Sequence, residues 1–411
     1  MIRKKEISLS RWKILIICLT IINLSVMLYV FNDGLYLPFI YMSYTMPFLY
    51  LLNKKKGLDI LDYHYLGLFG IVLLSSFVFN STNLRISTVL YSGLFIFTFL
   101  CYKELLMGSQ INPRIILNLI KSIICAFAIV MVLQQIQVLF FHTTAFNGAE
   151  WQTTIDRIKG AKFNSLSYEA SNVPLVLFIL TYSYTKIQQY VQGKKLNFKD
   201  SLKQFPLIWF CFFYVVISTF SLTSLFIVPF IFVQYVKISV RFIVLVVFAV
   251  IFAGALFPLL EGGNFERYRL LVGAITTLDV NQIIAADPSG AVRIFPYFEY
   301  VSSLDFIDIH TWLGHGTDSA KKYLNIIMFG DPDMEYGVGN ITSFFYDYGL
   351  IAAIVFLSAL KRTFNCRWFS FEMLCYWAVY SILQFNHTVL WLFIIMMFTI
   401  AYYKRYAKVN N

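Results

Sequence analysis

The sequence consists largely of long apolar runs that alternate with short polar breaks. A run such as 173–192 has the length of about 20 residues that an α-helix needs to cross a hydrocarbon layer about 30 Å thick. Of the 411 residues, 59% are hydrophobic and only 13% are charged. A soluble domain of this length needs many more polar residues to cover its surface. The sequence therefore predicts an all-α integral membrane protein with many spans.

The apolar runs predict a polytopic bundle of about twelve transmembrane helices. Their approximate ranges are 12–31, 35–52, 63–79, 86–102, 115–141, 173–192, 205–220, 222–236, 242–260, 342–360, 370–385 and 388–403. The first range follows a basic segment, as in a signal peptide, but it is too long for the apolar part of one and no small-residue cleavage site follows it. We therefore expect it to be an uncleaved first span.

Basic residues gather in alternate loops of this arrangement. The clusters at 54–56, 194–195 and 361–362 all fall on one side of the membrane, whereas the short loops around Asp33 and Asn386 have no Lys or Arg. Because Lys and Arg are enriched in cytoplasmic loops, both termini are expected in the cytoplasm. Topology then explains the net charge of +11, and no nucleic acid partner is expected.

Two outer loops are longer than the rest, at about 142–172 and 261–341. They divide the chain into 1–260, with nine spans and the first of these loops, 261–341, the large extracytoplasmic loop, and 342–411, with three spans and a cytoplasmic tail. The large loop contains eleven acidic and five basic residues, so its charge is opposite to that of the cytoplasmic side. Loops of this length usually carry function, and the alternative is a packed lid without chemistry.

Two arginines in the outer loops are candidate ligands of a phosphorylated lipid. Basic residues on this side oppose the charge bias, so each should have a reason to be there. A guanidinium group grips phosphate oxygens in a fork and neutralises the charge that develops on a diphosphate leaving group. We therefore expect Arg157 and Arg293 to hold a lipid diphosphate. The alternative is that each pairs with a loop acid or a lipid headgroup.

Other side chains of the large loop suit acid–base chemistry and carbohydrate binding. The imidazoles of His310 and His315 titrate near neutral pH. Their spacing of five does not place them on one helical face, and the chain has no HExxH or CxxC pattern, so no metal or other cofactor is expected. Trp312, Tyr297 and Tyr300 have flat apolar faces that suit stacking on sugar rings, and they suit anchoring at the membrane interface as well.

Three segments resemble patterns of the Wzy-type polysaccharide repeat-unit polymerases, relatives of the O-antigen ligases. RIKGAKFNSLSYEASN, residues 157–172, resembles the Arg, Gly, Phe, Glu-x-Ser signature that precedes a central span in that family. HTWLGHGTDSA resembles the Gly-x-Gly turn late in the large loop, with Gly314 and Gly316 in the key positions. NITSFFYDYGLIAAI is similar to the segment that re-enters the membrane, with Asn340 and Gly349 as the matching residues.

The resemblance implies a GT-C-like bundle that acts as a metal-independent glycosyltransferase in the cytoplasmic (inner) membrane. Such an enzyme polymerises undecaprenyl-diphosphate-linked oligosaccharide repeat units into O-antigen, capsule or exopolysaccharide at the outer face of that membrane. The donor is lipid-linked, so the resemblance implies no nucleotide cofactor. The implied partners, besides the lipid bilayer, are a flippase and a chain-length regulator.

The resemblance also suggests roles for the candidate residues. His310 or His315 would be the base or orienting group for the acceptor hydroxyl, and Arg157 and Arg293 would hold the departing diphosphate. Glu169 would orient an arginine or accept a hydrogen bond from a sugar hydroxyl at the outer end of the sixth span. The alternative is that Glu169 and its neighbouring serines satisfy backbone donors where that helix begins.

Two other functions fit parts of the sequence. An O-antigen ligase transfers a finished glycan from the same undecaprenyl diphosphate to a lipid acceptor, and the sequence separates it poorly from a polymerase. A lipid-linked oligosaccharide flippase or other transporter can also have twelve spans, but such proteins usually keep charges within the bundle. Here Lys121, Lys186, Asp347 and Glu372 lie near the ends of expected spans. The polymerase is therefore the preferred interpretation.

Overall fold

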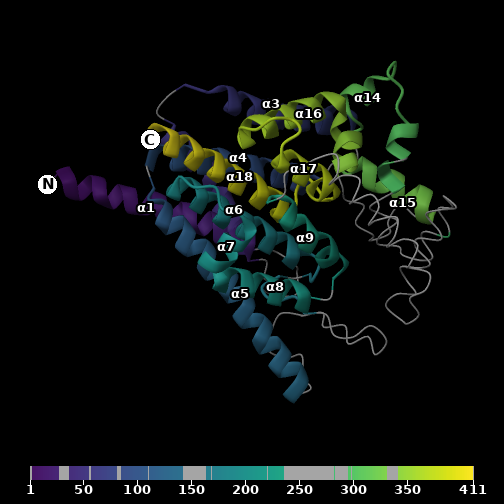
Figure 1. Ribbon diagram of the computed structural model, residues 1–411. Helices are drawn as coiled ribbons and strands as arrows, with labels where there is room; N and C mark the ends of the chain where they lie inside the picture. Colours follow the sequence, from purple (N-terminus) through teal and green to yellow (C-terminus); the bar gives the residue numbers. More distant parts are fainter. Residues whose placement is uncertain are drawn as a thin grey trace.

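The computed structural model describes residues 2–26, 37–54, 57–80, 85–109, 111–141, 163–167, 169–219, 221–235, 282, 295–297, 299–330 and 341–410. Within these ranges the chain is helical and has no β-strand, which confirms the all-α prediction for this part of the protein. The expected ninth span, 242–260, lies outside the described residues. Both chain ends lie on the left of Figure 1, whereas α14 and α15 lie on its right.

The helices follow the apolar runs closely in the first half of the chain. They are α1 (Ile2–Ser25), α2 (Leu37–Asn53), α3 (Ile60–Phe79), α4 (Ile86–Ser109), α5 (Pro113–Phe141), α6 (Asn172–Gln192), α7 (Phe198–Gln204), α8 (Pro206–Ser218), α9 (Leu222–Val233), α14 (Ile309–Leu313), α15 (Ser319–Phe329), α16 (Ile341–Phe364), α17 (Phe371–Ala378) and α18 (Thr388–Asn410), with a 3₁₀ turn at Tyr380–Ile382. Helices α2 to α6 begin within three residues of the second to sixth expected spans.

Five described helices are long and apolar enough to cross a membrane. They are Ile60–Phe79, Ile86–Ser109, Pro113–Val138, Ile341–Phe364 and Thr388–Arg405. A sixth span results if α7 and α8, which meet at a bend of 103°, count as one. This number of long apolar helices supports a multi-pass membrane protein. The described helices do not establish the expected total of twelve spans.

Three of the expected spans form helices that are too short to cross a membrane alone. The range 205–220 contains α8, whose 13 residues extend about 20 Å, and 222–236 contains α9, which has 12 residues. The two helices are separated by a turn in which the hydroxyls of Thr219 and Ser224 lie 2.7 Å apart. The range 370–385 contains α17, which ends at Ala378 because the φ of −122° at Val379 is not helical.

Helix α18 occupies the centre of the bundle. It packs against α1, α4, α6 and α16, and Figure 1 shows it between α4 and α6. Trp391 of α18 stacks on Phe95 of α4, with ring centroids 5.6 Å apart. Helix α3 packs against α4 and α16. The C-terminal end of α3 therefore meets the first turns of α16, where the Ser75 hydroxyl donates to the carbonyl of Asp347 at 2.9 Å.

Candidate functional site

Helix α16 is broken at Gly349, which has φ 78° and ψ 176°. Only glycine adopts this backbone region without strain. The late part of the large loop fills the break: the backbone N–H of His315 donates to the carbonyl of Tyr346 at 3.0 Å, and that of Gly316 donates to the carbonyl of Asp347 at 2.8 Å. Carbonyls at the end of a helical segment lack helical partners, so the loop supplies the donors that they need.

Two glycines allow the loop to come this close to α16. A Cβ on Gly314 would lie 2.2 Å from the carbonyl oxygen of Asp347, and a Cβ on Gly349 would lie 2.3 Å from the carbonyl oxygen of Trp312. Neither position accommodates a larger residue unless the backbone moves. The two late segments that resemble the polymerase family are therefore in direct contact, although the resemblance alone did not indicate that they meet.

The end of α3 anchors the same loop. A Cβ on Gly316 would lie 2.4 Å from the Cβ of Asn80, so this loop glycine is also tightly enclosed. The Asn80 amide donates to the carbonyl of Thr317 at 2.6 Å. The Thr317 hydroxyl lies within hydrogen-bonding distance of the hydroxyls of Ser76 in α3 and Tyr348 in α16. The loop is thus tied to two helices by backbone and side-chain hydrogen bonds.

Asp347 supplies the N-terminal cap of α15. Its Oδ1 atom accepts a hydrogen bond at 2.8 Å from the backbone N–H of Ala320, in the first turn of that helix. Asp318, which directly precedes α15, has φ 64° and makes no cap with its own side chain. Its carboxylate accepts instead from the hydroxyl of Thr88 in α4 at 2.9 Å. A carboxylate at a helix N-terminus is favourable, so Asp347 has a structural role here.

Four rings form one continuous stack beside the break. His310 stacks on His315 with ring centroids 4.8 Å apart and an interplanar angle of 17°. His315 stacks on Tyr346 at 4.1 Å and 7°, and Tyr346 stacks on Tyr323 at 5.0 Å and 14°. Phe79 of α3 contacts the ring of His310 edge-on at 4.8 Å. These contacts hold the planes of both imidazoles in place.

Both imidazoles direct Nδ1 at a backbone carbonyl. The Nδ1 atom of His310 lies 3.1 Å from the carbonyl oxygen of Gly314, and that of His315 lies 3.2 Å from the carbonyl oxygen of Tyr346. A carbonyl can only accept, so Nδ1 carries the hydrogen in each neutral ring and Nε2 keeps its lone pair. Among the described residues, none hydrogen-bonds either Nε2 atom.

The surroundings of His315 favour its neutral form. Burial lowers the pKa of His315 below its ordinary value of 6.5, and the hydrogen bond to the Tyr346 carbonyl acts in the opposite direction. The stacked ring of His310 lowers the pKa further, because two imidazolium ions at this distance would repel each other. His315 is therefore unprotonated at pH 7, and its Nε2 can accept a proton.

The far end of the ring stack contains residues that the sequence analysis did not identify. Tyr346 and Tyr323 complete the stack, and the Tyr323 hydroxyl donates to Oε1 of Glu299 at 2.9 Å. Burial and the bond to Glu299 both raise the pKa of Tyr323, so it stays a hydrogen-bond donor at neutral pH. No motif or spacing connects these three residues, because they come from separate segments of the chain.

The three aromatic residues predicted to bind sugar have different surroundings. Trp312 is 39% exposed, and its indole N–H donates to the carbonyl of Phe306 at 3.0 Å, so the face of its ring is partly accessible. The Tyr297 hydroxyl donates to the carbonyl of Ser381 at 3.1 Å. The buried hydroxyl of Tyr300 has no hydrogen-bond partner among the described residues. Only Trp312 belongs to the same short helix as His310.

Glu169 is exposed just before α6 and makes no described contact with the two histidines. Its backbone N–H donates to the hydroxyl of Ser167 at 3.4 Å, while Ser171, at the start of α6, makes no side-chain cap. The described residues just before Glu169 are mostly buried, and the N–H of Ser165 donates to the side chain of Gln134 at 2.9 Å. Of Ser167 and Ser171, only Ser167 satisfies a backbone donor, and that donor precedes α6.

The two arginines predicted to hold a diphosphate, Arg157 and Arg293, lie outside the described residues. Their distances from the histidine pair and from each other therefore stay untested. The described residues on the loop side of the junction with α16 do include two cations, Lys321 and Lys322 in α15. Both are partly buried, and neither forms an ion pair with another described residue.

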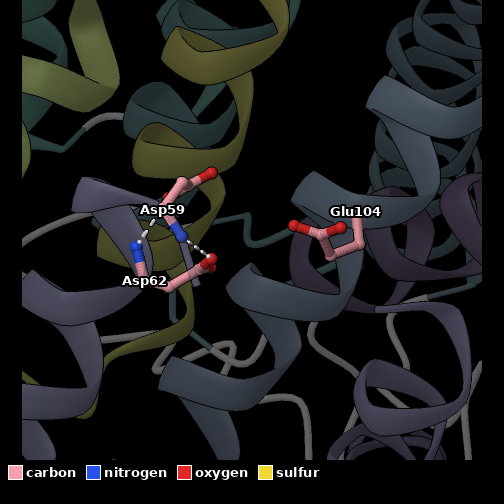
Figure 2. Close-up of side chains that lie close together, drawn as sticks. All are labelled: Asp59, Asp62 and Glu104. Carbon is pink, nitrogen blue, oxygen red and sulfur yellow. Dashed lines mark hydrogen bonds between the residues drawn. The ribbon is translucent and has the colours of Figure 1, made fainter. Parts of the chain in front are cut away.

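A second titratable cluster lies at the other end of α3 and α4. Figure 2 shows Asp59 and Asp62 joined by two hydrogen bonds, with Glu104 of α4 pointing toward them. Asp59 and Asp62 form a capping box: each side chain accepts from the backbone N–H of the other, at 2.9 and 2.8 Å. One oxygen from each of the three carboxylates lies within 4.8 Å of the other two. This spacing could suit a cation.

Two lysines provide the cations for this cluster. Nζ of Lys103 lies 2.7 Å from Asp59 and 2.5 Å from Asp62, and Nζ of Lys54 lies 2.8 Å from Glu104 and also contacts Asp62. Burial raises the pKa of Asp59, but the hydrogen bonds from Lys103 and from the backbone of Asp62, together with the charges of Lys103 and Lys54, lower it below the ordinary value of 3.8. The cluster is thus an ion-pair network that links the α2–α3 connection to α4, and it carries no catalytic assignment.

Comparisons with models of protein families, with curated proteins and with solved structures find no match to this chain. The functional assignment therefore depends on the residues and on their geometry.

Proposed function

We propose that this protein is a metal-independent glycosyltransferase of the cytoplasmic membrane. It polymerises undecaprenyl-diphosphate-linked oligosaccharide repeat units into surface polysaccharide. The observation that carries the proposal is the junction of the 310–317 loop with the break in α16, where stacked His310 and His315 both keep Nε2 free. Two of the segments that resemble the polymerase family build this junction. Its rigid backbone suits a site that must hold two sugar chains and a base in register.

His315 is the proposed general base. Its Nε2 takes the proton of a sugar hydroxyl on the incoming repeat unit, and the hydroxyl oxygen forms a bond to the anomeric carbon of the growing chain. The bond between that carbon and the phosphate oxygen breaks, and its electron pair leaves with undecaprenyl diphosphate. The proton then passes to the departing diphosphate. The carbonyl of Tyr346, which accepts from Nδ1, stabilises the imidazolium that forms during the step.

The remaining predicted residues have proposed binding roles. Arg157 and Arg293 neutralise the diphosphate, because guanidinium groups bind phosphate oxygens in a fork. The partly exposed face of Trp312 stacks on a sugar ring next to His310, with Tyr297 and Tyr300 in support. Glu169 orients an arginine or accepts a hydrogen bond from a sugar hydroxyl. These roles require the junction to lie at the outer face of the membrane, with both termini in the cytoplasm. The proposed partners are a flippase and a chain-length regulator.

The decisive experiment compares matched histidine variants in cells that make the polysaccharide. His315→Gln should reduce the surface glycan from long polymer to single repeat units, because Gln cannot act as a base. His64→Gln is the control: His64 lies on the other half of α3, where its Nε2 contacts the hydroxyl of Ser358 at 3.1 Å. Membrane levels of both variants are measured in parallel. Long polymer in a fully inserted His315→Gln variant would contradict the proposal.

The profile of a strain lacking the protein separates the polymerase from its alternatives. Single repeat units joined to the final acceptor indicate a polymerase. Long polymer that is not joined to an acceptor indicates a ligase, which would use the same leaving group. Lipid-linked units confined to the cytoplasmic leaflet indicate a flippase or other transporter. Only the first result supports the proposal.

A further inference from the structure

A cavity of about 720 Å³ lies at the end of the bundle opposite the histidine pair. It is formed by the start of α3, the ends of α4 and α16, the segment that follows α16, and α18. Its volume falls within the range of about 300–1,000 Å³ that is typical of small-molecule sites. The glycosyl transfer proposed above uses none of its lining residues.

The cavity is strongly basic. Its lining includes Lys361 and Arg362 from the last turn of α16, Arg405 from α18, and Lys103 from α4, with Asp59 as the one carboxylate. Lys103 is already paired with Asp59 at 2.7 Å and with Asp62 at 2.5 Å. The other three cations form no ion pair with any described residue. Like charges that converge on one cavity repel each other unless an anion lies between them.

The rim of the cavity has the composition of a membrane interface. Trp368 lines it, is 44% exposed, and carries the Lys361 ammonium over its ring at 4.9 Å. The next residue, Phe369, is fully exposed. Trp rings with a polar edge are enriched at the level of lipid headgroups, and an exposed Phe is favourable only in an apolar environment such as acyl chains. The cavity thus has beside it the residue types that are typical of the level of lipid phosphates.

We propose that this cavity binds the phosphate headgroup of an anionic phospholipid. The guanidinium groups of Arg362 and Arg405 and the ammonium of Lys361 contact the phosphate oxygens, and Trp368 and Phe369 hold the protein at the headgroup and acyl levels. The binding site is independent of the proposed glycosyl transfer. The bound lipid is a structural ligand, because it joins α16 to α18 at the basic end of the bundle.

The test uses the full-length protein in a neutral detergent. Phosphatidylglycerol, phosphatidylcholine and inorganic phosphate are added separately, and the Tm is measured over a range of concentrations. Phosphatidylglycerol should raise the Tm. The triple variant Lys361→Gln, Arg362→Gln, Arg405→Gln should bind it about 100-fold more weakly, since each cation near an anionic lipid contributes roughly a factor of five.

The control variant is Lys194→Gln, Lys195→Gln, which removes two exposed cations of another basic loop. It should respond to phosphatidylglycerol as the unmodified protein does. Native mass spectrometry of the purified proteins gives a second measurement, and retained phospholipid should be lost in the triple variant only. An equal lipid response of the triple variant would overturn the proposal. A Tm increase with inorganic phosphate at the same concentration would overturn the lipid assignment, because it would indicate a site for soluble anions.

Discussion

Gly314 and Gly349 touch each other across the break in α16: a Cβ on Gly349 would lie 2.6 Å from the backbone nitrogen of Gly314. Both glycines have a φ near 80° with an extended ψ, a conformation that other residues rarely adopt. The contact fixes the position of the loop that carries His310 and His315. Several measurable properties of the protein depend on it.

Gly349→Ala should destabilise the protein by about 2–4 kcal/mol, because it combines a disfavoured backbone conformation with an overpacked contact. Thermal unfolding in detergent measures the effect. Gly67→Ala in α3 is the control, since nothing lies within 4 Å of a Cβ at that position. If the Gly349→Ala variant unfolds at the same temperature as the control variant, the loop does not dock in the break.

The pH dependence of chain elongation should follow His315. The active form of a base is unprotonated, and burial lowers the pKa of His315 below 6.5, so the rate should stay high at pH 7 and fall only as the pH drops through a value below 6.5. Initial rates with lipid-linked repeat units in proteoliposomes give the profile. A midpoint above 6.5 would rule out His315 as the base.

The same shift has a consequence for stability. The unfolded chain takes up a proton on His315 at a higher pH than the folded protein does, so this residue should make the fold less stable as the pH falls below 6.5. The His315→Gln variant should show a smaller loss of Tm between pH 7 and pH 5 than the unmodified protein.

Tyr346→Phe should keep most of the activity, whereas Tyr346→Leu should reduce kcat by about 10- to 100-fold with little change in KM. Tyr346 stacks on His315 at 4.1 Å, and Phe preserves this ring contact while Leu removes it. The difference between the two variants separates positioning of the imidazole from a role of the Tyr346 hydroxyl. Equal loss in both would indicate that the hydroxyl itself matters.

Asp347→Ala should cost about 1–2 kcal/mol, because the N–H of Ala320 loses the acceptor that caps α15. Asp347→Asn retains an oxygen acceptor and should recover most of this stability. Hydrogen exchange at the first turn of α15 provides the measurement. The protection of these amides from exchange should fall in Asp347→Ala and be largely kept in Asp347→Asn. Unchanged protection in both variants would show that the cap does not stabilise α15.

Lys103→Met should destabilise the protein by about 3–5 kcal/mol, because it leaves Asp59 and Asp62 without their shared counter-ion. Lys103 is only 1% exposed, so water cannot replace the ammonium group. Lys194→Met, at an exposed position, is the matched control. Equal Tm values for the two variants would mean that the cluster is open to solvent.

The sequence by itself determined the class of the protein and the position of many helices. Apolar length and the shortage of charges predict an all-α membrane protein, because a helix in lipid must satisfy its own backbone hydrogen bonds. The starts of α2 to α6 follow from the same pattern. The same pattern separated the ranges that contain α8 and α9, but it did not reveal that both helices are too short to cross a membrane alone.

Only the tertiary structure decided how the candidate site is assembled. A spacing of five in a helix would separate His310 and His315, yet they stack because α14 ends at Gly314, which turns the chain back on itself. Likewise, Lys103 of α4 forms ion pairs with Asp59 and Asp62 at the start of α3. These contacts join segments that are far apart in the chain. They arise from positive-φ backbone and from helix packing, which side-chain periodicity along one segment does not encode.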